Sequence, residues 1–384
     1  MTEKTTYKTM AEHQRVYDLI WSQMPQMQKR TSSSWWFFLL FPQDEAGYGR
    51  RQLMFSLAAR VGERIRVNDV WLPGLDLQRP IENGIDQFHA MNVGWYFDGA
   101  QIHKMLKQPA LTTLDAAGSI TSWSEQADGR PYGGEIHASQ SHPLALASSW
   151  RWPGGKANFE AWGELFSLDS SPHESLNIDT FLGGTHFIAW RQMQFKGEFD
   201  LPAGRETLEG IGYFQRVCLN VPTFPWKWVW AVFPDGSIFS AYIPYVGRQL
   251  FRKGYSFFNS EKQEQRTIPL GQAGFWAWYR PSERILFNKA AVTPFFTDGP
   301  HPDFVVEVSN KQGDFLQFRA DVRGHTRFYI DRPVLGGRKE THWSYNEYMF
   351  RMQALDGRIG DKTINKETMG QGFGNLEYSW GLGL

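Results

Sequence analysis

The feature that most constrains the fold of this chain is a succession of short aromatic and β-branched runs separated by turn sequences. The clearest example spans residues 226–245, where WKWVWAVF is followed by Pro234-Asp235-Gly236 and then by SIFSAYIPY. Two such runs on either side of a Pro-Asp-Gly turn are typical of a β-hairpin. Because aromatic and β-branched residues favour strands, the pattern indicates antiparallel β-structure.

Similar units recur along the chain. Strands are expected at residues 35–41 with 51–59, 183–199 with 211–219, 304–320 around Asn310-Lys311-Gln312-Gly313, and 348–364 around Asp356-Gly357. Many short strands with regular turns favour a sandwich or a barrel over alternating β and α elements. One amphipathic helix is expected at residues 10–30, because Val16, Leu19, Ile20 and Met24 form an apolar stripe at helical spacing.

The length of the chain, 384 residues, suits two domains better than one core. A faint internal repeat agrees with this: THF at residues 185–187 precedes GIGY at 210–213, and THW at 341–343 precedes GQGF at 370–373. Chance matches would give the same pattern, so this alternative stays open. If each copy ends one barrel, the boundary lies in the Pro-rich turn near residues 220–224. We therefore expect domains at residues 1–220 and 221–384.

The charge and the termini exclude several classes of protein. Lys and Arg number 40 and Asp and Glu number 40, so the net charge of zero gives no attraction to nucleic acid. The first residues lack a signal-peptide pattern, and no apolar window reaches the roughly 18 residues of a membrane helix. Cys218 is the one cysteine, which suits a reducing compartment. We expect a soluble, cytoplasmic protein whose oligomeric state the sequence does not give.

The common catalytic and cofactor motifs are absent. The sequence contains no GxxxxGK[ST], HExxH, CxxC or GxSxG pattern. His137 and His142 lie five residues apart but lack a third ligand nearby, so no metal site is predicted. Cys218 lies in a strand pattern and is interpreted as a small buried apolar residue. No cofactor is expected.

One dense region, residues 209–230, combines polar groups with aromatic residues. Alternation along a strand places Tyr213 and Gln215 on one face and Arg216 on the other, and it places three tryptophans on one face of the next strand. These tryptophans either fill a core or form the wall of a pocket. If they form a pocket, the expected substrate-binding residues are Gln215, Arg216, Asn220, Trp226, Lys227, Trp228 and Trp230.

A pocket lined by Trp and Tyr stabilises developing positive charge and excludes water. Within it, Tyr213 is a candidate proton donor. Glu209 is a candidate acid if it is buried, because desolvation raises the pKa of a carboxyl group. His186 is the third candidate catalytic residue. The alternatives are an exposed turn position for Glu209 and a structural role for His186.

The stretch 213–230 resembles a motif of the superfamily that holds carotenoid 1,2-hydratases, tocopherol cyclases and fungal decalin-forming cyclases. Asn220 with FPWKWVW at residues 224–230 is similar to the Asn…Phe-Pro-x-Lys-Trp-x-Trp stretch of tocopherol cyclases. WWFF at residues 35–38 looks like the first-strand cluster of the family, and EYSWG at 377–381 looks like its closing strand. The His/Asp-rich run that carotenoid hydratases carry after their Gly-Tyr is replaced here by FQRV at residues 214–217.

The resemblance implies an all-β fold of two tandem lipocalin-like antiparallel β-barrels, preceded here by the N-terminal helix. It also implies a cofactor-independent cyclase, isomerase or hydratase that acts on an apolar isoprenoid- or polyketide-like substrate. The alternative is a non-catalytic carrier or sensor of a hydrophobic pigment or lipid. An enzyme is expected to place at least two titratable or strongly donating groups inside its cavity, whereas a carrier is expected to line it almost wholly with apolar side chains.

Overall fold

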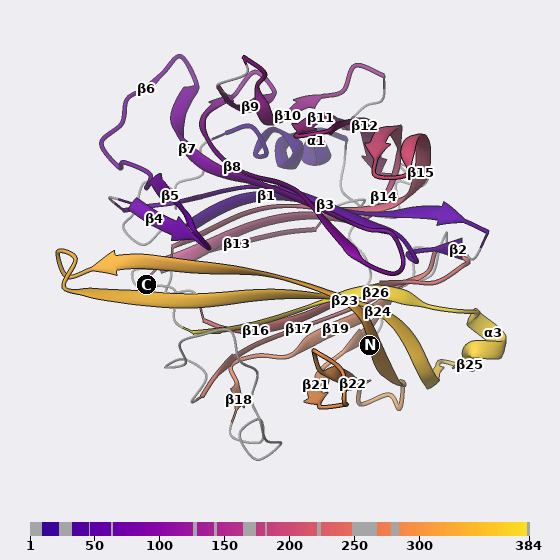
Figure 1. Cartoon of the computed structure of the whole chain (residues 1–384). Coiled ribbons are helices and arrows are strands. Elements are labelled where there is room, and N and C mark those ends of the chain that lie inside the picture. The colour runs from indigo at the N-terminus through magenta and orange to yellow at the C-terminus, as the bar shows by residue number, and fades with distance from the viewer. Residues whose placement is uncertain are drawn as a thin grey trace.

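The computed structural model describes residues 10–22, 33–45, 47–62, 64–125, 129–141, 144–163, 174–180, 183–220, 224–247, 267–277 and 284–381. Within these residues β-strands predominate, and the helices are α1 (Met10–Asp18) and α3 (Lys366–Met369). The fold is therefore all-β, as the recurring hairpin pattern predicts. Its strands form two antiparallel sheets, which lie one above the other in Figure 1.

The first sheet is a closed barrel. Its ten strands follow the order β12-β11-β10-β9-β8-β7-β3-β1-β15-β14, and β12 pairs with β14 to complete the ring. The strands are β1 (Ser33–Asp44), β3 (Gln52–Arg60), β7 (Ile85–Phe97), β8 (Ile102–Asp115), β9 (Ser119–Ser124), β10 (Tyr132–Ala138), β11 (Leu146–Trp152), β12 (Gly155–Gly163), β14 (Gly183–Leu201) and β15 (Gly204–Asn220). β2 (Gly47–Tyr48), β6 (Ile81–Glu82) and β13 (Glu174–Thr180) pair with β1, β7 and β14.

The second sheet follows the order β20-β19-β17-β16-β26-β24-β23-β22-β21. Its strands are β16 (Trp226–Val232), β17 (Ile238–Val246), β19 (Ala273–Ala277), β20 (Arg284–Phe287), β21 (Lys289–Phe295), β22 (Asp303–Ser309), β23 (Phe315–Val334), β24 (Lys339–Ile359) and β26 (Phe373–Gly381). β18 (Ile268–Pro269) and β25 (Lys362–Asn365) pair with β17 and β24. The strands at the two ends of this order, β20 and β21, are consecutive in the chain, and β21 also contacts β17 and β19, so the sheet curls round an interior core.

A hairpin from the N-terminal half joins the second sheet. β4 (Arg64–Val67) pairs with β5 (Val70–Pro73), and it also pairs with β23 through Val67 opposite Ile330 and Arg66 opposite Asp331. The Arg66 Nε atom lies 3.0 Å from the Asp331 carboxylate. This hairpin therefore links the two sheets at the side of their contact surface.

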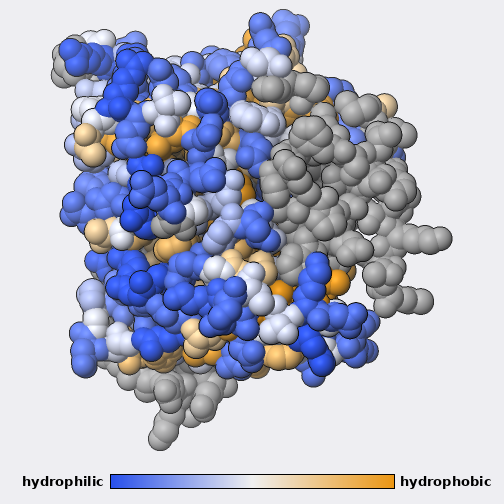
Figure 2. All heavy atoms as spheres, turned by 90° about the vertical axis from the view of Figure 1, so that its right-hand side faces the viewer, coloured by the Kyte–Doolittle hydropathy of each residue, from blue (hydrophilic) through white to orange (hydrophobic). Residues whose placement is uncertain are grey.

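The two sheets share a third apolar core between them. The outward-facing side chains of β1, β3 and β7, such as Phe37, Met54 and Trp95, pack here against Trp228 and Met349 of the second sheet. In the space-filling view of Figure 2, the described surface is mainly hydrophilic, with smaller hydrophobic areas between polar side chains. The aromatic residues are therefore mostly used inside the barrels and between them.

Two details differ from the sequence expectations. The helix α1 ends at Asp18, because residues 19–21 form tight turns in which Leu19 N–H donates to the Val16 carbonyl oxygen, and residues 23–30 of the expected helix lie outside the described part of the chain. The predicted turn at Asp356-Gly357 is also wrong: β24 runs through these residues, and the chain reverses between Ile359 and Lys362. Gly360 in this turn has φ +57°, a conformation that glycine adopts without strain.

Sheet membership changes between β15 and β16, which lie on either side of residues 221–223. Those residues, which include most of the predicted Pro-rich boundary, lie outside the described part of the chain. The division into domains at residues 1–220 and 221–384 stays a prediction.

Candidate functional site

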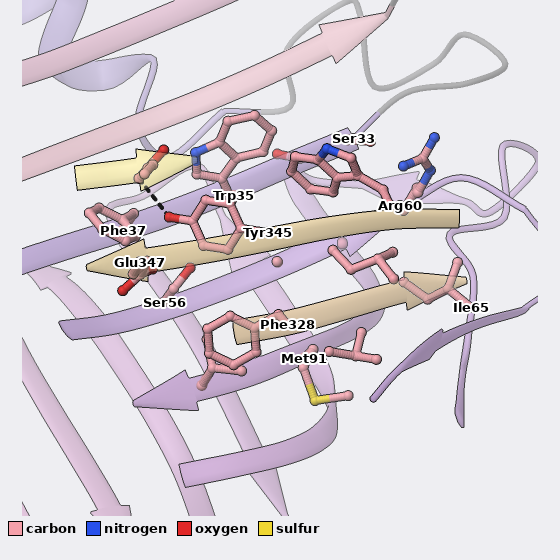
Figure 3. A pocket seen from close by; sticks show the side chains of 18 of the residues that line it. Ser33, Trp35, Phe37, Ser56, Arg60, Ile65, Met91, Phe328, Tyr345 and Glu347 are labelled. Carbon is pink, nitrogen blue, oxygen red and sulfur yellow. Dashed lines mark hydrogen bonds between the residues drawn. The ribbon is translucent and has the colours of Figure 1, made fainter. Parts of the chain in front are cut away.

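A cavity of about 140 Å³ lies between the two sheets. Its volume is close to that of an engineered apolar cavity of about 150 Å³ that binds benzene. The lining consists of Ser33, Ser34, Trp35, Phe37, Met54, Ser56, Ala58, Ala59, Arg60, Ile65, Val67, Met91, Val93, Gln215, Trp226, Phe328, Ile330, Trp343, Tyr345, Glu347 and Glu377. We call this cavity the intersheet pocket, and Figure 3 shows it from close by.

Strand alternation explains why the first barrel contributes an apolar wall. Successive side chains of a strand point to opposite faces of the sheet. Trp35 and Phe37 of β1 therefore face the second sheet, while Trp36 and Phe38 point into the interior core of the first barrel. On β3, alternate residues from Met54 to Arg60 line the pocket in the same way.

The second sheet contributes two buried carboxyl groups. Glu347 of β24 and Glu377 of β26 are directly opposite each other in the antiparallel register, and they are 0% and 4% exposed. Residues opposite each other in such a pair have Cβ atoms about 4.5–5.5 Å apart, so two negative charges there repel strongly. At least one proton is therefore expected to stay on the pair near neutral pH.

Hydrogen bonds hold both carboxyl groups in place. The Tyr345 hydroxyl donates to Glu377 Oε1 at 2.6 Å, a contact drawn as a dashed line in Figure 3, and Trp226 Nε1 donates to Glu377 Oε2 at 2.6 Å. Trp95 Nε1 donates to Glu347 Oε2 at 2.6 Å, while Glu347 Oε1 is buried without a partner among the described residues. The Tyr345 hydroxyl also lies near Glu347 and lowers the pKa of this carboxyl group.

The environment raises the pKa of both acids. Burial, followed by the charge of Glu377, raises the pKa of Glu347 to about 8. Burial also raises the pKa of Glu377 to about 7, against the lowering effect of the hydrogen bonds from Tyr345 and Trp226. The pKa of the Tyr345 phenol is raised well above its usual value by burial and by both glutamates. This cluster can therefore hold a carboxylic acid next to a group that accepts a proton.

Of the residues that the sequence indicated, Gln215 and Trp226 line the intersheet pocket. Tyr213 lies behind Gln215 and donates a hydrogen bond to its Oε1 atom at 2.8 Å. Trp228 and Trp230 pack against the Tyr213 ring, at centroid distances of 5.0 and 5.9 Å, in the core between the sheets. These two tryptophans therefore fill a core, as one of the two interpretations expects.

The other indicated residues lie elsewhere. Glu209 is exposed and pairs with Lys196 at 3.1 Å, so the burial that its role as an acid requires is missing. His186 is buried opposite Cys218, which belongs to the interior core of the first barrel. The structure does not bring these two residues into the intersheet pocket.

The remaining polar residues are also separated from the pocket. Arg216 is buried inside the first barrel, with its guanidinium 3.8 Å from the centroid of the Trp36 ring. Lys227 donates to the Val292 carbonyl oxygen at 2.6 Å inside the second sheet. Asn220, the last residue of β15, is buried but does not line the pocket.

Sequence reasoning missed Glu347, Tyr345 and Arg60. A signal for the acids is present, because SYNEYMF at residues 344–350 and NLEYSW at 375–380 each hold a single acidic residue within an aromatic strand. A buried carboxylate in such a strand is rare unless it is paired or functional. The segment 377–381 was considered only as a closing strand.

Within the described ranges, no three His, Cys, Asp or Glu side chains gather in a way that could hold a metal ion. His142 lies outside these ranges, so its spacing with His137 is not tested. No helix in the described part of the chain is long and apolar enough to cross a membrane.

Comparison with known proteins gives distant structural likenesses. No family model matches the chain, and no curated protein matches its sequence. A crystal structure of an ATTH protein from Nitrosomonas europaea is 9% identical, with a TM-score of 0.47, and the match covers 93% of this chain and 96% of that one. Kievitone hydratase from Nectria haematococca is 10% identical with a TM-score of 0.43, covering 99% and 97%. CghA in complex with Sch210972 is 10% identical with a TM-score of 0.42, covering 92% and 89%.

At 9% and 10% identity, these likenesses concern the fold alone. The function proposed below depends on the residues of this chain.

Proposed function

We propose that this chain is an acid–base enzyme that isomerises, cyclises or hydrates an apolar small molecule in the intersheet pocket. The observation that carries the proposal is the buried pair of Glu347 and Glu377, which lies beside an aromatic wall. The Tyr345 hydroxyl donates a hydrogen bond to Glu377 of this pair. General acids and bases work best when their pKa lies near the working pH. Burial brings both carboxyl groups into that range.

The two acids suit different roles. Glu377 accepts hydrogen bonds from Tyr345 and Trp226, which favour its charged form, whereas burial and the charge of Glu377 hold the proton on Glu347, which serves as the acid. Its proton passes to a double bond or an oxygen of the substrate, which becomes cationic. The rings of Trp35, Trp226 and Trp343 line the same pocket and stabilise that positive charge.

The charged intermediate has two fates. Removal of another proton by the Glu377 carboxylate gives an isomer or a ring with no net change in atoms, and Glu377 later returns the proton to Glu347. Capture of the cation by water, followed by loss of a proton to the same base, gives a hydrated product. The substrate determines which of these outcomes follows.

The pocket also supports the enzyme over a carrier. A carrier needs only an apolar lining, whereas this lining includes three titratable groups, Tyr345, Glu347 and Glu377, at neighbouring positions of two paired strands. Burying acids is costly, and a binding protein gains nothing from that cost unless its ligand uses them.

The experiment compares the wild type with Glu347→Gln and Glu377→Gln in D₂O on a panel of short polyenes and single-ring alkenes, which match the cavity of about 140 Å³. Deuterium incorporation and product formation are read by mass spectrometry. We expect each substitution to lower turnover by about 10²- to 10⁴-fold, the usual contribution of a general acid or base.

Glu209→Gln is the matched control, because Glu209 is exposed and lies outside the pocket. Full turnover in both pocket variants would contradict the proposal. Binding by the wild type without turnover or deuterium exchange across the panel would favour the carrier.

A further inference from the structure

A positive charge that has no acidic partner among the described residues lies at one end of the intersheet pocket. Arg60, the last residue of β3, lines the pocket and is 6% exposed. Its Nε and Nη2 atoms are buried and have no hydrogen-bond partner among the described residues. In Figure 3, Arg60 lies toward the end of the pocket away from Glu347. A buried guanidinium with unused donors is costly, because it has lost hydration without replacing it.

A second unused polar group lies next to Arg60. Ser33 of β1 is directly opposite Arg60 in the antiparallel register, and it also lines the pocket. Its hydroxyl oxygen is buried and has no partner among the described residues. Side chains at opposite positions of paired strands are about 5 Å apart at Cβ. One hydroxyl and one guanidinium therefore face the same end of the cavity with free hydrogen-bonding capacity.

The charges around Arg60 do not supply the missing partner. Burial and the nearby positive charge of Arg332 lower the pKa of Arg60 to about 9. Asp331, which precedes Arg332 on β23, already binds the Arg66 guanidinium and the His342 ring. The acids of the pocket, Glu347 and Glu377, belong to the cluster around Tyr345 and Trp95. Because none of these described charges pairs with Arg60, an anion brought by a ligand would satisfy its donors.

We propose that Arg60 and Ser33 bind the carboxylate of the substrate, so that the enzyme acts on a small amphipathic carboxylic acid. A carboxylate presents two coplanar oxygens, which match the Nε and Nη2 edge of a guanidinium. It carries a single negative charge, which would pair with the charge of Arg60. This inference assigns a substrate class to the site of the proposed function and rests on it.

The rest of the pocket limits the apolar part of this acid. The lining between Arg60 and the glutamates is mainly apolar, with Ala58, Ile65 and Met91 among its members. The cavity volume of about 140 Å³ suits one ring or a short chain. Anchoring the carboxylate at Arg60 directs this apolar part toward Glu347, which orients the reacting bond for proton transfer.

The test compares acids with their matched alcohols: 3-phenylpropanoate with 3-phenylpropan-1-ol, and the C6, C8 and C10 alkanoates with the corresponding 1-alkanols. Binding to the full chain is measured by calorimetry. Because a hydrogen bond to a charged group contributes far more than a neutral one, we expect the preferred acid to bind about 10- to 100-fold more tightly than its alcohol.

Arg60→Gln should abolish this preference, and Arg60→Lys should retain part of it because the charge remains. Arg205→Gln is the matched control, since Arg205 is exposed and pairs with Glu198. Equal binding of acid and alcohol by the wild type at every chain length would overturn the inference, and this comparison does not depend on the folding of any variant. An unchanged preference in folded Arg60→Gln would overturn it as well.

Glu347→Gln separates the two proposals. If this variant keeps full turnover, the proposed function fails while the acid preference can still stand. If it loses turnover and the wild type shows no preference for acids, only the assignment of the carboxylate to Arg60 fails. Loss of turnover together with an Arg60-dependent preference supports both.

Discussion

The buried glutamate pair predicts that part of the stability of this protein is lost as the pH rises from 5 to 7. Both carboxyl groups have an unperturbed pKa of 4.5, and the fold raises that of Glu347 to about 8 and that of Glu377 to about 7. Over this pH window the unfolded chain releases both protons while the folded chain retains most of them. The free energy of unfolding therefore falls as pH rises.

The expected loss of stability follows from the two pKa shifts. Each proton that the folded chain retains and the unfolded chain has lost reduces stability by about 1.4 kcal/mol per pH unit. For the pair this amounts to roughly 4 kcal/mol between pH 5 and pH 7, once partial titration at both ends is included. Because whole domains are stable by only about 5–15 kcal/mol, the effect is large enough to measure.

Glu347→Gln/Glu377→Gln removes this dependence. Gln keeps an oxygen that accepts the hydrogen bond from Trp95 or Trp226, but it carries no titrating proton. In the wild type, His325 has the opposite effect on the pH dependence of stability. Because burial lowers its pKa to about 4, this residue adds stability as the pH rises toward 6.5. The difference between variant and wild type cancels the contribution of His325.

The assay is urea unfolding followed by tryptophan fluorescence at pH 5, 6 and 7, with the m-value checked for constancy. The double variant should gain roughly 4 kcal/mol relative to the wild type between pH 5 and pH 7. Glu209→Gln should follow the wild type, since Glu209 is exposed. A difference between double variant and wild type that is the same at pH 5 and pH 7 would refute the argument that the pair folds with retained protons.

Two further substitutions test other parts of the pocket. Trp95→Phe removes the hydrogen bond that favours the charged form of Glu347, so the pKa of this acid should rise further and the basic limb of the pH–rate profile should move to higher pH. Ala58→Leu places a larger side chain in the cavity of about 140 Å³, so ligand binding should weaken at least about tenfold while the melting temperature stays within a few degrees of the wild type.

The strands could be predicted because their signals are local. The hairpin at residues 226–245 follows from a run of aromatic residues, a Pro-Asp-Gly turn and a return strand, and the structure forms it as β16 and β17. The expected helix continues past Asp18, because the apolar stripe that predicts it includes residues of the following turns. Ile20 and Trp21 are buried against the first barrel without being helical.

The position of the pocket is not a local property. Every residue of β16 is buried, so the burial expected along this strand does not tell which of its two faces is turned toward the other sheet. Gln215 and Trp226 line the intersheet pocket, whereas Arg216 belongs to the opposite face of β15, which points into the first barrel. Strand alternation shows which residues share a face of a strand, but it does not show which face is turned toward the other sheet.

The acidic cluster depends on contacts between distant parts of the chain. Trp95 and Glu347 are 252 residues apart in sequence, and their hydrogen bond joins the two sheets. Glu347 faces Glu377 only through the register of β24 and β26. A single buried acid in each strand is visible in the sequence, but their proximity is a consequence of the sheet order.

The chemistry of the intersheet pocket requires both halves of the molecule. The second sheet supplies Tyr345, Glu347 and Glu377, whereas the first barrel supplies Arg60, Ser33 and most of the apolar wall. Neither set is buried without the other, because each lies on the outer face of its own sheet. Water would reach the glutamates in the isolated second sheet, and their pKa would then return toward 4.5. The contact between the sheets is therefore what turns ordinary surface carboxylates into acids that can work at neutral pH.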